Sequence, residues 1–222
     1  MNHEKQAVRK LRLSWPEIPE SHIESLELFF VQLRAVDGET ARLSPHELHE
    51  SLWGILGILS RCYQLLLCSI KQVGDRNLNG FYVAARGLVE TLCSVVWVNE
   101  KPERLCNLVQ LESLRIGRIM NSGYRKYPNL NTVYSNMSSI VHPNRTSQSL
   151  GPRSMEEVKD NGVFGPFSLN FSAGFAQKMI DDLINLISLI ISELETVISG
   201  GEDVVRGGRL MVRVRNRMQD EA

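Results

Sequence analysis

The sequence predicts an all-α protein: an up-and-down helical bundle of five or six helices, with one long loop and a basic C-terminal tail. Two observations lead to this prediction. Apolar residues recur at helical spacing in long stretches that open with helix-capping signals, and most links between these stretches are short. The sequence contains no pattern of a βαβ unit, no glycine-rich phosphate loop and no nucleophile elbow.

The first two helices are predicted from their capping signals. Ser21 opens a capping box and a helix over residues 21–36. Ser44 caps the next helix and Pro45 takes its first position, and the apolar pattern continues over residues 44–73.

The later helices follow from apolar periodicity and from breaks rich in Gly, Pro and Asn. They are predicted over residues 78–99, 102–121, 130–141 and 172–199. The stretch SGYRKYPN, residues 122–129, is expected to be a loop. The last helix is apolar around most of its circumference, which predicts a central position in the bundle or a place in a dimer interface.

The long loop and the tail lie at either side of this last helix. Residues 142–171 are rich in Pro, Gly, Ser and Asn, and loops of this length in compact domains are usually functional. Residues 206–217 hold five arginines and no acid, and the alternation in RLMVRVR is typical of a strand. The tail either contacts phosphates or is a solvated or strand-exchanging segment. The predicted division is an N-terminal segment 1–20, a bundle 21–200 and a tail 201–222.

Composition narrows the class of protein. The 222 residues suffice for one domain with tails, and 43% of them are hydrophobic. The formal net charge is zero, so attraction to nucleic acid must be local. We expect no signal peptide and no membrane span, since the longest apolar run, residues 183–191, is short. Four cysteines without a Cys-x-x-Cys pair predict reduced core residues in a cytoplasmic protein: Cys62, Cys68, Cys93 and Cys106.

Two groups of polar residues interrupt the apolar pattern. Arg86 and Glu90 lie four apart among apolar neighbours, which predicts a partly buried ion pair that either orients two helices or faces a site. Tyr134, Ser138 and His142 are spaced by four and share one stripe of a helix, which a proline ends directly after His142. His142 either caps the helix or pairs with Glu90, or it serves as a general acid or base. We expect His142, Tyr134, Arg86 and Glu90 to cluster.

Two motifs, ARGLVETL at residues 85–92 and YSNMSSIVHP at residues 134–143, together resemble a bacterial family of the HEPN superfamily (higher eukaryotes and prokaryotes nucleotide-binding domains). The resemblance covers about residues 50–200. It implies an up-and-down bundle that dimerises and brings two copies of the motif together. Many members are metal-independent ribonucleases of toxin–antitoxin, anti-phage or RNA-guided defence systems, and others bind without catalysis.

Catalytic members of the superfamily carry Arg-x(4–6)-His near a helix end. His142 fits the histidine, which would act on the RNA 2′-hydroxyl or the leaving oxygen while the arginine stabilises the phosphorane charge. The arginine does not fit, because the uncharged Asn136 stands in its region. Arg86, Arg145 or the basic tail would have to supply the positive charge instead.

Three functions are compatible with these residues. The first is a non-catalytic module, a homodimer or a subunit of a defence or stress complex, which binds RNA, a nucleotide or a protein partner. The second is a ribonuclease toxin, and the third is a purely structural protein whose polar stripe fixes helix register. No cofactor and no metal are expected. The candidate catalytic residues are His142, Arg86, Glu90 and Tyr134, and the candidate binding residues are Asn136, Ser138, Asn144, Arg145, Arg209, Arg213 and Arg215.

Overall fold

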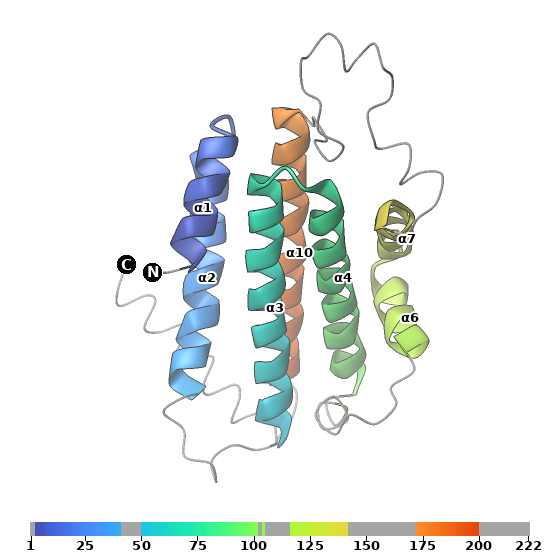
Figure 1. The fold of residues 1–222 in the computed structure, drawn as a ribbon. Coiled ribbons are helices and arrows are strands. Elements are labelled where there is room, and N and C mark those ends of the chain that lie inside the picture. The colour runs from blue at the N-terminus through green and yellow to red at the C-terminus, as the bar shows by residue number, and fades with distance from the viewer. Residues whose placement is uncertain (1–2, 41–49, 102–103, 105–115, 142–171, 200–222) are drawn as a thin grey trace.

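The computed structural model describes residues 3–40, 50–101, 104, 116–141 and 172–199 (Figure 1). Within these ranges the chain forms seven helices and no strand, which confirms the prediction of an all-α protein. The helices are α1 (His3–Ser14), α2 (Glu20–Thr40), α3 (Glu50–Gly74), α4 (Leu78–Glu100), α6 (Ile116–Lys126), α7 (Asn129–Val141) and α10 (Ala173–Ser199).

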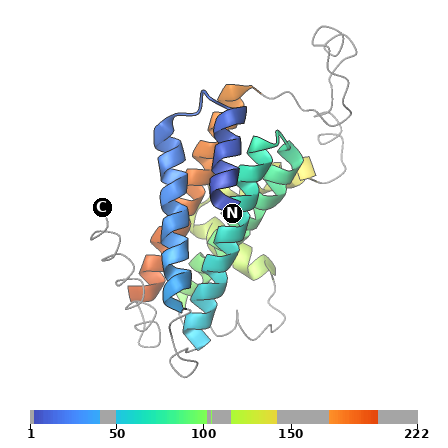
Figure 2. The same ribbon diagram turned by 60° about the vertical axis from the view of Figure 1, so that its left-hand side comes forward.

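Helix α4 lies at the centre of the arrangement. It packs against α3 and α10, which in turn contact α2 on the far side of the bundle, and its outer side is covered by α6 and α7 (Figures 1 and 2). Leu88, Leu92 and Val95 of α4 are completely buried. Among the described helices, the backbones of α6 and α7 approach only α4 and each other. The position of α4 therefore decides where α6 and α7 can dock.

Most predicted helix ends agree with the structure. Asn77 caps α4, and its side chain accepts a hydrogen bond from the Gly80 amide at 3.0 Å. Ser172 does the same for α10, where the Phe175 amide lies 3.3 Å from its hydroxyl. Helix α10 packs against α2, α3 and α4, so the expected central position of this helix is confirmed. The start at Ser44 lies outside the described residues, as do most of 102–121, the long loop and the tail.

The N-terminal segment, for which no helix was expected, forms α1. Ala7, Val8 and Leu11 are buried against the bundle, and the Trp15 indole donates a hydrogen bond to the Val73 carbonyl at 2.9 Å. The apolar residues of α1 occupy a narrow stripe between charged positions. Such a short stripe is stabilised by tertiary packing more than by local propensity, so the sequence pattern alone was a weak signal.

The expectation of a loop over residues 122–129 is wrong, because the first part of this stretch completes α6. Helix α6 runs to Lys126, and only Tyr127 and Pro128 separate it from α7. A glycine in this stretch favours a break in the sequence pattern, but Gly123 is buried and faces Cys93 of α4. The missing side chain allows α6 to approach α4 closely, which is a packing role that a sequence pattern does not distinguish from a turn.

The cysteines only partly follow the prediction of core residues. Cys62 and Cys93 are buried, whereas Cys68 is exposed on the outer side of α3, so the prediction is wrong for Cys68. Cys106 lies outside the described residues. Trp53–Gly74 and Leu78–Glu100 are long and apolar enough to cross a membrane, although 72% of the α4 window is buried inside the bundle, as in the core helix of a globular protein.

The close approach of α6 to α4 predicts a specific cost for a methyl group at Gly123. An added Cβ would lie 2.2 Å from the Cys93 sulfur and 3.1 Å from its Cα. We expect Gly123→Ala to lower the free energy of unfolding by about 1 to 3 kcal/mol, measured by urea unfolding, because overpacking outweighs the helix propensity of alanine.

Gly117→Ala in the same helix is the matched control. Nothing lies within 4 Å of a Cβ added at Gly117, so this change should leave the free energy of unfolding equal or raise it by up to about 1 kcal/mol. A Gly123→Ala protein as stable as the Gly117→Ala protein would contradict the packing of α6 on α4.

Candidate functional site

The predicted pair on α4 forms the floor of a polar cluster. The Arg86 Nε lies 3.5 Å from Glu90 Oε1, and the two side chains are 27% and 25% exposed. The spacing of four residues places both groups on one side of the helix. Because most of the remaining circumference of α4 is buried and apolar, this pair occupies a polar strip on an otherwise apolar helix.

Tyr134 of α7 joins this pair from the covering layer. Its hydroxyl donates a hydrogen bond to Glu90 Oε1 at 2.8 Å, and the Arg86 guanidinium lies 4.7 Å from the centroid of its ring. The buried side chains of Leu130 and Met137 hold α7 in this position. Burial and the hydrogen bond to Glu90 raise the pKa of Tyr134, so the phenol stays protonated and acts as a donor at neutral pH.

Arg61 of α3 completes the coordination of the Glu90 carboxylate. One terminal nitrogen of Arg61 lies 3.2 Å from Glu90 Oε2, and its Nε donates to the Thr91 hydroxyl at 3.1 Å. The Arg61 side chain remains 54% exposed. Glu90 thus receives donors from three helices. Nothing in the sequence spacing relates Arg61 to the motif at residues 85–92, so sequence reasoning missed this residue.

Tyr124 and Cys93 border the cluster from α6 and from the α4 core. Burial raises the pKa of Tyr124, and the nearby Cys93, Tyr134 and Glu90 add to this shift. Burial, followed by the charge of Glu90, raises the pKa of Cys93 to about 11, so its thiol stays protonated. Cys93 is therefore no thiolate nucleophile, and Tyr124 is a second phenol beside the cluster that the sequence analysis did not single out.

The structure brings together three of the four residues expected to cluster: Arg86, Glu90 and Tyr134. Asn136 lies with its side chain exposed, and Ser138 is partly buried on the stripe of Tyr134. His142 directly follows Val141, the last residue of α7, and its place in the cluster stays a prediction. The sequence-predicted candidates outside the described residues are His142, Asn144, Arg145, Arg209, Arg213 and Arg215.

A second polar cluster surrounds Glu193, a buried carboxylate of α10. Lys126 lies 2.7 Å from its Oε1, the Asn99 amide donates to its Oε2 at 2.9 Å, and the Tyr127 hydroxyl donates to Oε1. These donors come from α4 and from the junction of α6 and α7. Since the buried carboxylate is fully hydrogen-bonded, it links this junction to the bundle.

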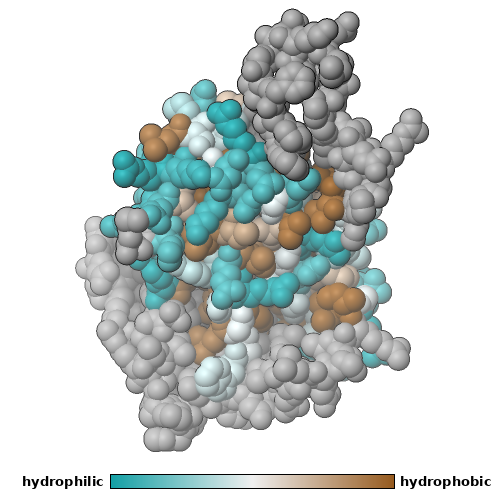
Figure 3. Space-filling view, viewed as in Figure 1, coloured by the Kyte–Doolittle hydropathy of each residue, from teal (hydrophilic) through white to brown (hydrophobic). Residues whose placement is uncertain are grey.

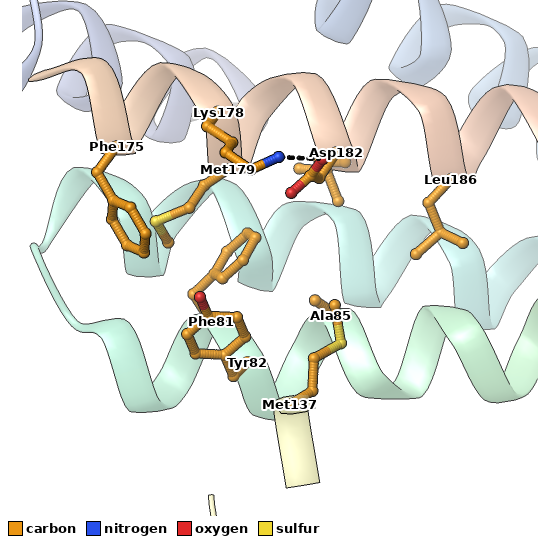
Figure 4. A pocket seen from close by; sticks show the side chains of 10 residues that line it. Phe81, Tyr82, Ala85, Met137, Phe175, Lys178, Met179, Asp182 and Leu186 are labelled. Atoms are coloured by element: carbon orange, nitrogen blue, oxygen red, sulfur yellow. Dashed lines mark hydrogen bonds and ion pairs between the residues drawn. The ribbon is translucent and has the colours of Figure 1, made fainter. Parts of the chain in front are cut away.

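A small apolar pocket of about 60 Å³ lies between α4, α7 and α10. Figure 4 shows that Phe81 and Tyr82, Met137 and the side chains of Phe175 and Met179 line it from these three helices. The only ion pair among its lining residues joins Lys178 to Asp182 on α10, and both side chains are more than half exposed. The pocket therefore offers apolar contact with little polar specificity.

The Arg61–Glu90–Arg86–Tyr134 cluster is suited to binding an anion. Two guanidinium groups face one carboxylate, so positive charge remains, and guanidinium groups pair well with phosphate. Within the described part of the chain, no group of three or more His, Cys, Asp or Glu side chains could hold a metal ion. Comparison of the chain with family models, with curated proteins and with solved structures gives no match.

The Glu193 cluster predicts a pH-dependent contribution to stability. Burial alone would raise the pKa of Glu193, but hydrogen bonds from Lys126, Tyr127 and Asn99 outweigh burial and lower it below the ordinary value of 4.5. The unfolded chain therefore binds this proton more readily than the folded chain. The contribution is complete above a pH of about 4.5 and is lost as the pH falls further.

We expect Glu193→Gln to lower the free energy of unfolding at pH 7 by about 1 to 3 kcal/mol, because the charged hydrogen bonds are lost. The variant should also lose less stability than wild type on acidification, as measured by urea unfolding between about pH 6 and pH 3. Asp182→Asn, in an exposed ion pair on the same helix, is the control and should change stability by less than about 0.5 kcal/mol. Parallel pH profiles for wild type and Glu193→Gln would refute the assignment.

Proposed function

We propose that this chain is a HEPN-like helical module of a bacterial defence or stress system, which binds RNA or a nucleotide through Arg61, Arg86, Glu90 and Tyr134 without cleaving it. The proposal includes the up-and-down course of its helices, a homodimeric or complex-bound state and a place in the cytoplasm.

One observation supports this function above the others. Residues 85–92 and 134–143 carry the resemblance to the superfamily, and the described parts of both segments pack against each other, with Tyr134 hydrogen-bonded to Glu90 and stacked beneath Arg86. If the ion pair of Arg86 and Glu90 only held helices together, it would not need a second guanidinium. Arg61 adds a second guanidinium that is more than half exposed, so the cluster presents positive charge to solvent.

The same geometry favours binding over cleavage. The region of α7 where catalytic members carry their arginine holds Asn136, whose side chain is exposed and uncharged. Arg61 and Arg86 are both engaged with Glu90, which holds them in place. Fixed guanidinium groups bind a phosphate ground state with little entropic cost, whereas catalysis also requires stabilisation that grows in the transition state.

RNA binding is tested by fluorescence anisotropy with a labelled single-stranded RNA oligonucleotide. We expect wild-type protein to bind it with an affinity that falls as salt rises, and Arg61→Ala to weaken binding by about tenfold or more. Arg12→Ala is the matched control, because Arg12 is 44% exposed and likewise paired with carboxylates, but lies on α1, which does not pack against α4. Equal affinities for Arg61→Ala and Arg12→Ala, or no binding by wild type, would overturn the proposal.

A metal-independent ribonuclease is the second candidate, and one contact favours it. Arg86 lies over Tyr134, which shares its α7 stripe with Ser138 and whose sequence spacing predicts His142 as the next member, so α4 offers the guanidinium that the α7 motif lacks. In this case His142 is the general acid or base, and Arg86 or Arg145 binds the phosphate.

The two candidates differ in their effect on total cellular RNA incubated with the protein and EDTA. The non-catalytic module leaves the RNA intact at high protein concentration. Cleavage by wild type that is absent in His142→Ala would establish the ribonuclease and reject the non-catalytic proposal. Cleavage that persists in His142→Ala would point to a contaminating nuclease, and purification to constant specific activity would then decide.

A further inference from the structure

A second arginine–aromatic contact lies on α4, beyond the Arg61–Glu90–Arg86–Tyr134 cluster. The Arg104 guanidinium is 4.7 Å from the centroid of the Trp97 ring. Its NH1 atom donates to the Trp97 carbonyl at 2.6 Å and to Glu100 Oε2 at 3.0 Å. With a side chain only 21% exposed, Arg104 is held in one orientation. The arrangement repeats that of Arg86 on Tyr134.

The two contacts lie on the same side of α4. Arg86 and Trp97 are separated by three helical turns, which places them in line and about 16 Å apart along the axis. Glu90 and Ser94 lie between them, and both are partly exposed. A continuous polar strip therefore joins the cluster to the Trp97–Arg104 contact. Trp97, too, is only partly buried.

Cations from both neighbouring helices flank this strip. Arg61 of α3 reaches Glu90, and Arg125 of α6 reaches Glu100 Oε1 at 2.7 Å with a side chain that is 69% exposed. Figure 1 shows α4 between α3 and α6, and on the same face Figure 3 shows hydrophilic residues interspersed with hydrophobic ones. An open hollow of about 650 Å³ lies beside Arg125, lined also by Asn99 and Ser122.

Among the described residues, arginines outnumber carboxylates along the strip. Burial alone would raise the pKa of Glu100, but hydrogen bonds from Arg125, Arg104 and Ser122 outweigh burial and lower it, so Glu100 is ionised at neutral pH. Even with Glu90 and Glu100 charged, Arg61, Arg86, Arg104 and Arg125 leave the described part of the strip positive. A ligand that spans it should carry several negative charges and flat groups that stack on guanidinium or indole.

We propose that Trp97, Arg104 and Arg125 form a second subsite, and that the ligand is a single-stranded RNA lying along α4. This inference rests on the proposed function. A strand with bases stacked at about 3.4 Å covers the distance of about 16 Å with about five nucleotides, and an extended strand with fewer. A mononucleotide bound at the Arg61–Glu90–Arg86–Tyr134 cluster does not reach the second subsite.

The test measures affinity against ligand length, by calorimetry with AMP and with single-stranded RNA of two to ten nucleotides. We expect the affinity of wild type to rise with length up to about five nucleotides and then to level off. Arg125→Ala should weaken the binding of long strands by about tenfold and leave AMP binding unchanged, whereas Arg61→Ala should weaken both. Because the Arg125 side chain is 69% exposed, Arg125→Ala should fold as wild type does, and circular dichroism of each variant checks this.

Arg104→Lys supplies an independent variant that keeps the charge but loses the planar group over Trp97. Arg104→Lys should weaken the binding of long RNA strands and leave AMP binding unchanged. If AMP binds and longer RNA binds no more tightly, the second subsite is wrong while the proposed function stands. The same conclusion follows if neither Arg125→Ala nor Arg104→Lys lowers the affinity for long RNA. If an RNA duplex of equal length binds as tightly, the single-stranded ligand is wrong. If no RNA and no nucleotide bind at all, the proposed function itself fails.

Discussion

The burial of α4 is the constraint on which the other features depend. Helices pack against it on several sides, so most of its side chains are buried and apolar, and one partly exposed strip contains Arg86, Glu90, Ser94 and Trp97. Apart from the contact of Asn99 with Glu193, the covering helices bring polar groups to α4 along this strip. Tyr134, Arg61 and Arg125 converge there for that reason, and the candidate site is a consequence of how the core helix is covered.

Two carboxylates show how burial separates structural from functional clusters. Glu193 is buried, and a lysine, a phenol and an amide satisfy it, so its charge is compensated within the protein. Glu90 remains one quarter exposed and faces two guanidinium groups. The surplus positive charge at Glu90 is available to a ligand. The same kind of interaction therefore links helices around Glu193 and presents positive charge around Glu90.

The α6–α7 pair connects these two roles. Gly123 lets α6 approach α4, Tyr127 fixes the junction to Glu193, and α7 then carries Tyr134 over Arg86. A shift of this pair would separate the phenol from Glu90 and from Arg86. The rigidity of the site thus depends on a glycine and a buried carboxylate that do not themselves face the proposed ligand.

The sequence by itself determined the all-α class, the extents of α4 and α10 and the neighbourhood of Arg86 and Glu90, since capping, apolar periodicity and the i, i+4 relation are local. The pairing of Tyr134 with this ion pair was also anticipated, and the place of His142 remains a prediction. Only the tertiary structure decided that α1 is a helix, that Gly123 is a packing contact and that Arg61 joins Glu90. These features depend on contacts between residues far apart in the chain, for which a single sequence holds no spacing rule.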